Sequence, residues 1–353
     1  MITEILKIND IKTDAALIDR AGTLIRNGGI VALPTETVYG LGANAFDPSA
    51  VAKVFEAKGR PADNPFIVHI CERSQMYDLC HDIPDEAKAL SEKLMPGPLT
   101  IILPRNDSIP DIVTAGLPTV GIRFPSHPIA RAIIKASGVP VAAPSANRSG
   151  RPSTTSFAHT YEDLNGRVDA IVDGGESYAG VESTVVEVNC GKVRMLRPGV
   201  ITLDDIHSAL EESGFHNCEI ELDAALRRKL EANEKPRAPG MKYRHYAPTA
   251  PVTAFVGDPD KTAEEIAKRS SGRDHIAVLC YDEYKDMFKT SVSYGGRDDL
   301  TAQAHNLFDA LRSFDSMDGI EEILAQCPDD DGVGLAVANR LKKAAGFNVV
   351  SVG

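Results

Sequence analysis

The sequence predicts an α/β protein with two domains. Its 353 residues are too many for one ordinary hydrophobic core. Short apolar runs alternate along the chain with stretches of helical periodicity, which is the pattern of strands connected by helices. Clusters of hydroxyl, amide and basic side chains repeatedly follow the apolar runs. Since open α/β sheets bind ligands at strand ends, these clusters predict a ligand site.

The first two thirds of the chain contain most of the expected strands. An amphipathic helix at 14–26 ends at the turn signal Asn27-Gly28-Gly29, and a strand at 30–33 follows. Further strands are expected at 66–70, 100–103, 119–124, 138–143, 170–173, 183–188 and 193–196, and further helices at 50–57, 84–94 and 128–137, with another beginning at Thr202. Residues 148–155 are rich in Ser, Gly and Pro, which predicts a mobile loop, and the charged stretch 219–237 is predicted to be helical.

The last hundred residues repeat a strand–helix rhythm of their own. The expected strands are 251–256, 275–280 and 319–324, and the expected helices are 259–270, 298–314 and 333–345. This predicts a small Rossmann-like parallel sheet with helices on its faces and no evident chemistry. We therefore expect a catalytic domain at 1–212, a linker at 213–250 and a C-terminal domain at 251–353.

The polar stretch PTETVYGLG, from Pro34 to Gly42, follows the strand at 30–33. It combines one carboxylate with three hydroxyls, those of Thr35, Thr37 and Tyr39. Its proline fixes the entry angle of the chain, and its glycines allow backbone to approach a ligand. An ordinary strand-to-helix loop explains these residues equally well.

Two cations, Lys58 and Arg60, stand at the end of the helix expected at 50–57. Cations commonly complement the dipole at a helix C-terminus, so this position alone does not indicate catalysis. Arg123 lies inside an apolar strand, where a charge is costly unless paired, so it should meet a carboxylate of the protein or of a ligand. His69 alternates with apolar neighbours, a pattern more typical of an interior histidine than of a catalytic one.

A further polar group, Ser145 and Asn147, falls just after the strand expected at 138–143. These residue types readily form turns. They are also neutral donors suited to phosphate oxygens. The segment around Tyr243 and His245 combines cations with aromatic rings, which is unusual for a passive linker.

Composition excludes several classes of protein. The net charge is −12, and both halves of the chain are negative, which disfavours stable nucleic-acid binding. No apolar run approaches the roughly 20 residues of a membrane span, and the N-terminus lacks a secretory signal pattern, so a cytoplasmic location is expected. The six cysteines include no CxxC pair, which disfavours a zinc site or a disulfide framework. The usual phosphate-binding motifs GxxxxGK[ST] and GxGxxG are absent as well.

Taken together, the polar clusters resemble the YrdC-like family in its longer, two-domain form, the L-threonylcarbamoyladenylate synthases. The resemblance runs along roughly residues 20–250, because many motifs occur in the family's order. They are PTETVYGLG, Lys58-Gly59-Arg60-Pro61, Asn64-Pro65 with His69, Ser145-Ala146-Asn147, Ser183-Thr184, Arg197-Pro198-Gly199 and Lys242-Tyr243-Arg244-His245-Tyr246-Ala247-Pro248.

The resemblance implies a twisted, mixed, open sheet around a deep cavity. It also implies the ATP-dependent conversion of L-threonine and bicarbonate or CO2 to L-threonylcarbamoyl-AMP and pyrophosphate, the first step of tRNA N6-threonylcarbamoyladenosine formation. Mg²⁺ would accompany ATP, through ligands that the sequence does not identify. Other proteins would transfer the threonylcarbamoyl group to tRNA. The linker would close over the active site.

The resemblance also implies roles for individual residues. The family's KxR…SxN signature, assigned to catalysis, corresponds to Lys58, Arg60, Ser145 and Asn147. L-Threonine would be bound by Thr35, His69, Arg123, Ala143 and Ser183. ATP would be bound by Arg60, Asn64, Thr119, Ser145, Arg197, Tyr243 and His245.

Three other functions remain open at this point. The chain could be a double-stranded RNA-binding protein, although its charge argues against this. It could be another carbamoyl-transfer enzyme related to hydrogenase maturation, although the zinc-finger cysteine pairs of that class are missing. It could also be a non-catalytic relative, although the KxR…SxN set is intact. The oligomeric state and the basis for rejecting serine are not evident from the sequence.

Overall fold

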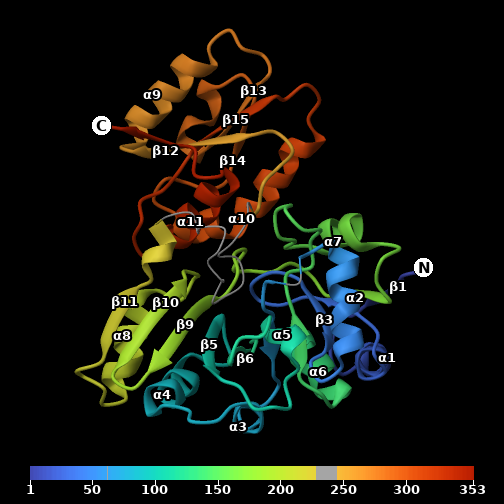
Figure 1. Ribbon diagram of the computed structural model, residues 1–353. Coiled ribbons are helices and arrows are strands. Elements are labelled where there is room, and N and C mark those ends of the chain that lie inside the picture. Colours follow the sequence, from blue (N-terminus) through green and yellow to red (C-terminus); the bar gives the residue numbers. More distant parts are fainter. Residues whose placement is uncertain (62, 228–244) are drawn as a thin grey trace. The chain divides into compact units, whose positions relative to one another are not determined.

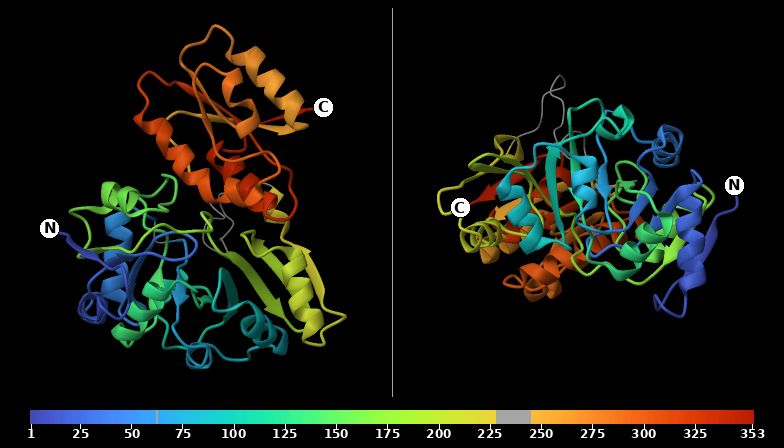
Figure 2. Two further views of the ribbon diagram at one scale, coloured as in Figure 1. Left: turned by 180° about the vertical axis from the view of Figure 1, so that it is seen from behind. Right: turned by 90° about the horizontal axis from the view of Figure 1, so that it is seen from below.

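The computed structural model describes residues 1–61, 63–227 and 245–353, and it divides the chain into two compact units. The first unit comprises Met1–Ser149, Thr154–Tyr178 and Glu182–Lys242. The second comprises Gly150–Ser153, Ala179–Val181 and Tyr243–Gly353. Figure 1 labels the helices and strands of both units, and Figure 2 gives two further views.

The first unit is built on a mixed sheet of eleven strands in the order β1-β8-β2-β3-β7-β4-β6-β5-β9-β10-β11. The strands are β1 (Glu4–Lys7), β2 (Val31–Leu33), β3 (Gly40–Asn44), β4 (Ile67–His69), β5 (Leu99–Pro104), β6 (Thr119–Arg123), β7 (Val141–Ala143), β8 (Ala170–Asp173), β9 (Thr184–Asn189), β10 (Lys192–Arg197) and β11 (Glu219–Leu222). The predicted mixed, open sheet is confirmed. A deep cavity within it stays a prediction.

Eight helices are described in this unit. They are α1 (Ala15–Arg26), α2 (Pro48–Lys58), α3 (Gln75–Leu79), α4 (Asp85–Leu94), α5 (Asp111–Thr114), α6 (Pro128–Ser137), α7 (Phe157–Leu164) and α8 (Leu203–Glu212). Helix α8 begins with a capping box between Thr202 and Asp205, which explains why its start was readable from the sequence.

Hydrophobic clusters cover both faces of the sheet. In β2, Val31 and Leu33 belong to a cluster that also contains apolar residues of α1 and α6, whereas Ala32 belongs to the larger cluster on the other face. Helices α1 and α6 lie side by side (Figure 1) because Gly22 brings the two backbones together: a Cβ on Gly22 would lie 2.7 Å from the backbone of Ala136. Burial of both faces explains the continuous apolar runs of these strands.

Two sequence-based assignments differ from the structure. Residues 40–44 form strand β3, so the PTETVYGLG stretch connects two antiparallel strands and not a strand and a helix. Residues 219–222 form β11, not a helix, because they pair in parallel with β10. Residues 148–155, predicted to be a mobile loop, contain no helix or strand, but the side chains of Ser153 and Thr154 are fully buried.

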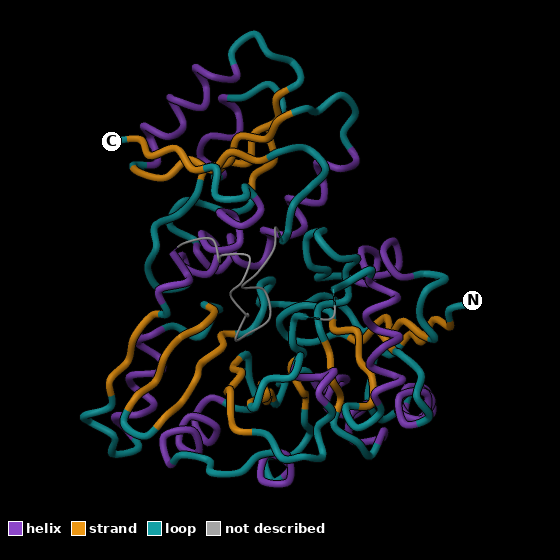
Figure 3. Tube along the Cα trace, in the orientation of Figure 1, coloured by secondary structure: helices purple, strands orange, loops and turns teal. Residues whose placement is uncertain are grey.

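The second unit contains an all-parallel sheet, as predicted, and its strands lie in the order β14-β13-β15-β12-β16. Figure 3 colours the strands of both units orange. Its strands are β12 (Val252–Gly257), β13 (Ile276–Cys280), β14 (Ser291–Ser293), β15 (Glu322–Gln326) and β16 (Val349–Val352), and its helices are α9 (Pro259–Ser270), α10 (Leu300–Ser313) and α11 (Gly334–Ala344). Parallel crossovers are almost always right-handed. Because the crossover through α9 runs in the opposite direction from those through α10 and α11, α9 covers one face and the other two cover the opposite face (Figure 1).

Two segments from earlier in the chain complete this second unit. The carbonyl of Pro152 accepts a hydrogen bond from Arg312 of α10 at 2.6 Å, and the carbonyl of Gly150 accepts one from the amide of Ala247 at 3.0 Å. Gly180 packs so closely on α10 that a Cβ there would lie 2.3 Å from the carbonyl oxygen of Ala304. The domain boundaries predicted at 212 and 250 stay a prediction; the two compact units draw on additional, earlier segments of the chain.

Candidate active site

The loop that carries Ser145 and Asn147 is attached to the start of β3. Ala146 N donates to Tyr39 O at 2.7 Å, and Leu41 N donates to Pro144 O at 2.9 Å. Ser145 also forms an isolated bridge with Gly40. The Ser-Ala-Asn cluster and the PTETVYGLG stretch, distant in the sequence, are therefore neighbours in the fold.

Lys58 connects these loops to helix α2. Gly59, with φ of 63°, ends the helix in the left-handed conformation that glycine adopts readily, so Lys58 is its last residue. The Lys58 ammonium donates to the carbonyl oxygens of Ser145 and Asn147, and the Lys58 carbonyl accepts from Ser149 N at 2.9 Å. Ser145 in turn donates its hydroxyl hydrogen to Asn147 Oδ1. The structure thus brings Lys58, Ser145 and Asn147 together, with Lys58 only 4% exposed.

A second group of predicted site residues lies around the start of strands β4 and β6. It consists of Arg60, Asn64 and Thr119. Arg60 Nη2 donates to the carbonyls of Asn64 and Pro65 at 3.3 and 3.4 Å, and its guanidinium lies 5.4 Å from the centre of the Phe66 ring. Strands β4 and β6 are parallel with Ile67 opposite Gly121, so Thr119 is level with Pro65. Asn64 is 2% exposed, and its Oδ1 has no hydrogen-bond partner among the described residues.

Two of the residues predicted to bind L-threonine, His69 and Arg123, lie at the other end of β4 and β6. His69 is opposite Arg123 in the β4–β6 register, and β7 places Ala143 beside Ile67 on the other side of β4. Thr119 and Arg123 are four residues apart along β6, which is roughly 13 Å at the rise of a strand. Thr119 and Arg123 are therefore at separate ends of β6, whereas Ala143 lies beside the start of β4, near the Thr119 end.

A chain of contacts joins Arg123 to Arg197 through three strands. Thr100 of β5 is opposite Arg123 of β6, and its hydroxyl lies 2.8 Å from that of Ser183. Arg197 donates from Nε to the Ser183 carbonyl and from Nη2 to the Ser183 hydroxyl, both at 3.0 Å. The Ser183 hydroxyl is fully buried and contacts both Thr100 and Arg197.

Arg123 meets a carboxylate of the protein, one of the two partners the sequence allowed. Its Nη2 lies 2.8 Å from Glu36 Oε1, and both side chains are almost fully buried. The same Nη2 donates to Thr35 Oγ1 at 3.4 Å. Thr35 and Glu36, consecutive residues of the PTETVYGLG stretch, therefore hold one nitrogen of Arg123.

The protonation states in this region follow from burial and from the ion pair. Burial lowers the pKa of His69 to about 3, with the charge of Arg123 acting in the same direction, so His69 is neutral at pH 7. Burial alone would raise the pKa of Glu36, but the Arg123 guanidinium outweighs it and holds that pKa below its ordinary value. Burial also lowers the pKa of His127, which faces Glu36.

Sequence reasoning missed two members of this group, Glu36 and Thr100. Glu36 was noticed only as the carboxylate of its loop, although the requirement that Arg123 be paired was a signal. For Thr100 the sequence shows only a polar residue at the start of an apolar strand, which does not by itself indicate a site. Of the residues assigned to ATP, Tyr243 lies outside the described part of the chain, and His245 belongs to the second unit.

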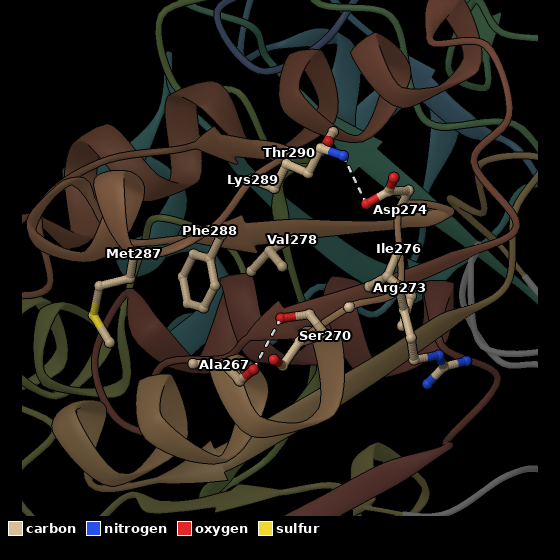
Figure 4. A pocket seen from close by; sticks show the side chains of 12 residues that line it. Ala267, Ser270, Arg273, Asp274, Ile276, Val278, Met287, Phe288, Lys289 and Thr290 are labelled. Atoms are coloured by element: carbon tan, nitrogen blue, oxygen red, sulfur yellow. Dashed lines mark hydrogen bonds and ion pairs between the residues drawn. The ribbon is translucent and has the colours of Figure 1, made fainter.

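The second unit has a pocket of about 180 Å³ at the N-terminal end of β13 (Figure 4). Met287, Phe288 and Val278 line it, together with an ion pair of 2.6 Å between Lys289 and Asp274. Its lining contains none of the residues assigned to threonine, ATP or catalysis. Among the described residues no group of three or more His, Cys, Asp or Glu side chains is arranged to hold a metal ion, and no described helix is long and apolar enough to cross a membrane.

Known protein families match both parts of this chain. Residues 23–199 match the family described as "Telomere recombination", and residues 201–346 match the family described as "Threonylcarbamoyl-AMP synthase, C-terminal domain". A threonylcarbamoyl-AMP synthase of Bacillus subtilis is 46% identical over 97% of this chain and 96% of that protein. The chain belongs to the two-domain family of threonylcarbamoyl-AMP synthases.

Solved structures within this synthase family have the same fold. The crystal structure of Pyrococcus abyssi Sua5 complexed with L-threonine is 41% identical, covers both chains completely and has a TM-score of 0.89. A structure of a double alanine variant of the same protein, changed at a histidine and a tyrosine, has a TM-score of 0.90 at 42% identity and covers 99% of this chain and 98% of that one. The threonylcarbamoyl-AMP synthase of P. abyssi is 44% identical over 94% of this chain and 95% of that protein.

Gly199, in the Arg197-Pro198-Gly199 motif, has no room for a side chain. A Cβ there would lie 2.4 Å from Thr184 N and 2.8 Å from Glu182 O. We expect Gly199→Ala to lower the free energy of unfolding by about 1–3 kcal/mol, because backbone cannot move aside as a flexible side chain can. Urea unfolding followed by circular dichroism measures the change. Gly296→Ala is the control, since its Cβ would lie 3.4 Å from the nearest atom; equal stability of the two variants would contradict the expectation.

Proposed function

We propose that the site around Lys58, Ser145 and Asn147 carries out the activity of the threonylcarbamoyl-AMP synthase family in this chain. That activity is a nucleotidyl transfer that uses ATP and forms threonylcarbamoyl-AMP, the first step of tRNA threonylcarbamoyladenosine formation. The observation that carries the proposal is the contact of the Lys58 ammonium with both carbonyls of the Ser-Ala-Asn loop. In the proposed reaction the neutral amine of L-threonine takes up CO2 with loss of a proton, or bicarbonate with loss of water. The resulting carbamate attacks the α-phosphorus of ATP, and pyrophosphate is the leaving group.

This chemistry depends mainly on positioning and on stabilisation of negative charge. Bicarbonate, the carbamate and the triphosphate are all anions. The buried ammonium of Lys58 and the guanidinium of Arg60 supply positive charge, and Ser145 and Asn147 supply neutral donors. Because His69 is neutral at pH 7, it contributes as a hydrogen-bonding group and not as a cation.

We assign two neighbouring halves to the site. Thr35, His69, Arg123, Ala143 and Ser183 bind L-threonine, with Arg123 directed at the amino acid's carboxylate. Arg60, Asn64, Thr119, Ser145 and Arg197 bind the nucleotide. The contacts of Tyr243 and His245 with ATP stay predictions from the sequence, since Tyr243 lies outside the described residues and His245 belongs to the second unit. The separation of roughly 13 Å between Thr119 and Arg123 along β6 supports different ends for the two substrates, and the hydrogen bonds of Arg197 to Ser183 join the two halves.

Mg²⁺ is expected to enter with ATP. The described residues offer no cluster of three possible ligands. Mg²⁺ in nucleotide sites is commonly held by substrate phosphates and waters with few protein ligands, so this arrangement is compatible with its binding. No protein ligand is assigned to it, and no step is derived through it.

The wider setting follows from the same proposal. The product, a reactive mixed anhydride, would be consumed by a separate tRNA-threonylcarbamoyl transferase. Closure of the predicted linker over the site would protect this product from water, and it stays a prediction, because Glu219–Leu222 belongs to the sheet as β11 and residues 228–244 lie outside the described part of the chain. A cytoplasmic location and the lack of stable nucleic-acid binding remain predictions from the sequence.

Pyrophosphate release from ATP and Mg²⁺ tests the proposal. We expect release that requires both L-threonine and bicarbonate, because neither alone forms the carbamate. Release with another amino acid instead of threonine would keep the mechanism and change the substrate. A folded protein that releases no pyrophosphate would refute the catalytic proposal, and a filter-binding assay with a salt titration would then test the double-stranded RNA alternative.

A further inference from the structure

Glu36 is a buried carboxylate for which the family comparison supplied no role. It lies in the loop between β2 and β3, is 0% exposed, and comes within 2.8 Å of Arg123 at the end of β6. Removing a carboxylate from water is costly, and a buried ion pair is therefore a poor source of stability by itself. Its presence beside the residues assigned to L-threonine suggests that it serves binding.

The contacts of Arg123 show which part of its guanidinium Glu36 engages. Both Glu36 Oε1 and Thr35 Oγ1 contact Nη2, at 2.8 and 3.4 Å. The Nε of Arg123 is buried and has no hydrogen-bond partner among the described residues. A buried N–H without a partner is unfavourable, so a native protein that retains one commonly reserves it for another group.

The loop itself is rigid enough to orient Arg123. Thr35 Oγ1 donates to Val38 O at 2.6 Å and accepts from the amides of Thr37 and Val38, which closes a turn around Glu36. Tyr39 anchors the end of the turn through its hydroxyl, which donates to Gly175 O at 2.6 Å. The backbone that carries Glu36 is thus held in place, and its carboxylate contacts Arg123.

We propose that Glu36 is a positioning residue for substrate recognition, holding Nη2 of Arg123 so that the unpaired Nε is presented to the carboxylate of the amino acid. Glu36 also neutralises Arg123 while the site is empty. The guanidinium is a planar group with fixed donor directions, so holding one of its edges determines where the remaining donors point. This inference deepens the proposed function and rests on the assignment of Arg123 to the amino-acid carboxylate.

Glu36→Gln tests the proposal, because it keeps the size of the side chain and removes its charge. We expect KM for L-threonine to rise about 10- to 100-fold, the range for losing a hydrogen bond to a charged group, while kcat and KM for ATP change little. Wild-type turnover in the same assay tests the proposed function separately, since it does not depend on what Glu36 does.

A substrate analogue separates a positioning role from a structural one. Threoninol has an alcohol in place of the carboxylate of threonine. With wild-type protein we expect threoninol to be a weak competitive inhibitor, with an inhibition constant far above KM for L-threonine. The ratio of these two constants measures the preference for threonine over threoninol. In Glu36→Gln the preference for threonine over threoninol should be smaller, because the variant loses affinity for the substrate carboxylate, which threoninol lacks. A preference equal to that of the wild type, or a matching rise in KM for ATP, would overturn the proposal.

A pair of variants checks that Glu36 acts through Arg123. If it does, Glu36→Gln should add little to the rise in KM for threonine that Arg123→Met causes alone. Fully additive effects would show that Glu36 contributes independently and would also overturn the proposal. Glu86→Gln is the matched control, because this glutamate is also buried at 7% exposure and its carboxylate accepts a hydrogen bond from Gly191 N at 2.8 Å, outside this cluster. It should leave the preference for threonine over threoninol unchanged.

Discussion

Lys58→Ala is expected to reduce threonine-dependent pyrophosphate release by at least about 100- to 1,000-fold, the usual cost of removing one group that stabilises developing charge. Lys58 is the cation that contacts the Ser145 and Asn147 carbonyls, so its loss removes a charge and also loosens the loop. We expect the fall to appear in kcat as well as in kcat/KM, because the missing stabilisation is strongest at the α-phosphorus in the transition state.

Lys53 provides a control for this experiment on the same helix. Its ammonium also donates to a backbone carbonyl, that of Gly28 at 2.7 Å, but it is exposed and lies outside the assigned site. Lys53→Ala should therefore release pyrophosphate at nearly the wild-type rate. If the two alanine variants were equally active, Lys58 would have no catalytic role.

Arg123→Met is expected to give the largest loss of stability among single changes in the site. It leaves Glu36 buried without its counter-ion, and breaking a buried pair in this way typically lowers the free energy of unfolding by about 3–5 kcal/mol. Urea unfolding followed by far-ultraviolet circular dichroism is a suitable measurement, since the chain contains no tryptophan. The double variant with Glu36→Gln should recover part of the loss, because it removes the unpaired charge.

The pH dependence of this loss has a definite sign. In the wild type the pKa of Glu36 lies below its ordinary value, so its contribution to stability is complete above the ordinary carboxyl pKa and is lost as the pH falls through the lowered value. Without Arg123, burial raises that pKa, and the folded protein gains stability by taking up a proton.

His69 also makes the loss of stability smaller at low pH. Arg123 contributes to lowering the pKa of His69 in the wild type, so without Arg123 the folded protein takes up a proton on His69 more readily. His127 also faces Glu36, and the carboxylate favours its protonated form. The deficit of Arg123→Met should therefore be larger at pH 8 than at pH 5. A deficit that does not vary over this range would mean that Glu36 is not left as a buried, unpaired carboxylate.

Much of the fold could be predicted because local patterns agree with it. The apolar runs at 100–103 and 170–173 are strands buried on both faces, and such strands keep the same pattern in most contexts. The segment 219–222 was mispredicted, although its sequence, EIEL, alternates with the period of a strand. Pairing with β10 determines its conformation, since Glu219 and Glu221 form ion pairs with Lys192 across the two strands.

Part of the candidate site could likewise be predicted from local sequence features, and part could not. The residue types of Lys58, Ser145 and Asn147, and their positions after a helix and a strand, are local features that the sequence alone established. The partner of Arg123 was left open, because Glu36 is 87 positions away in the chain and nothing local links them. Strand order brings such residues together, and strand order depends on how whole faces of the sheet are buried. The chemistry of the individual groups was therefore readable from the sequence, whereas their pairing required the folded sheet.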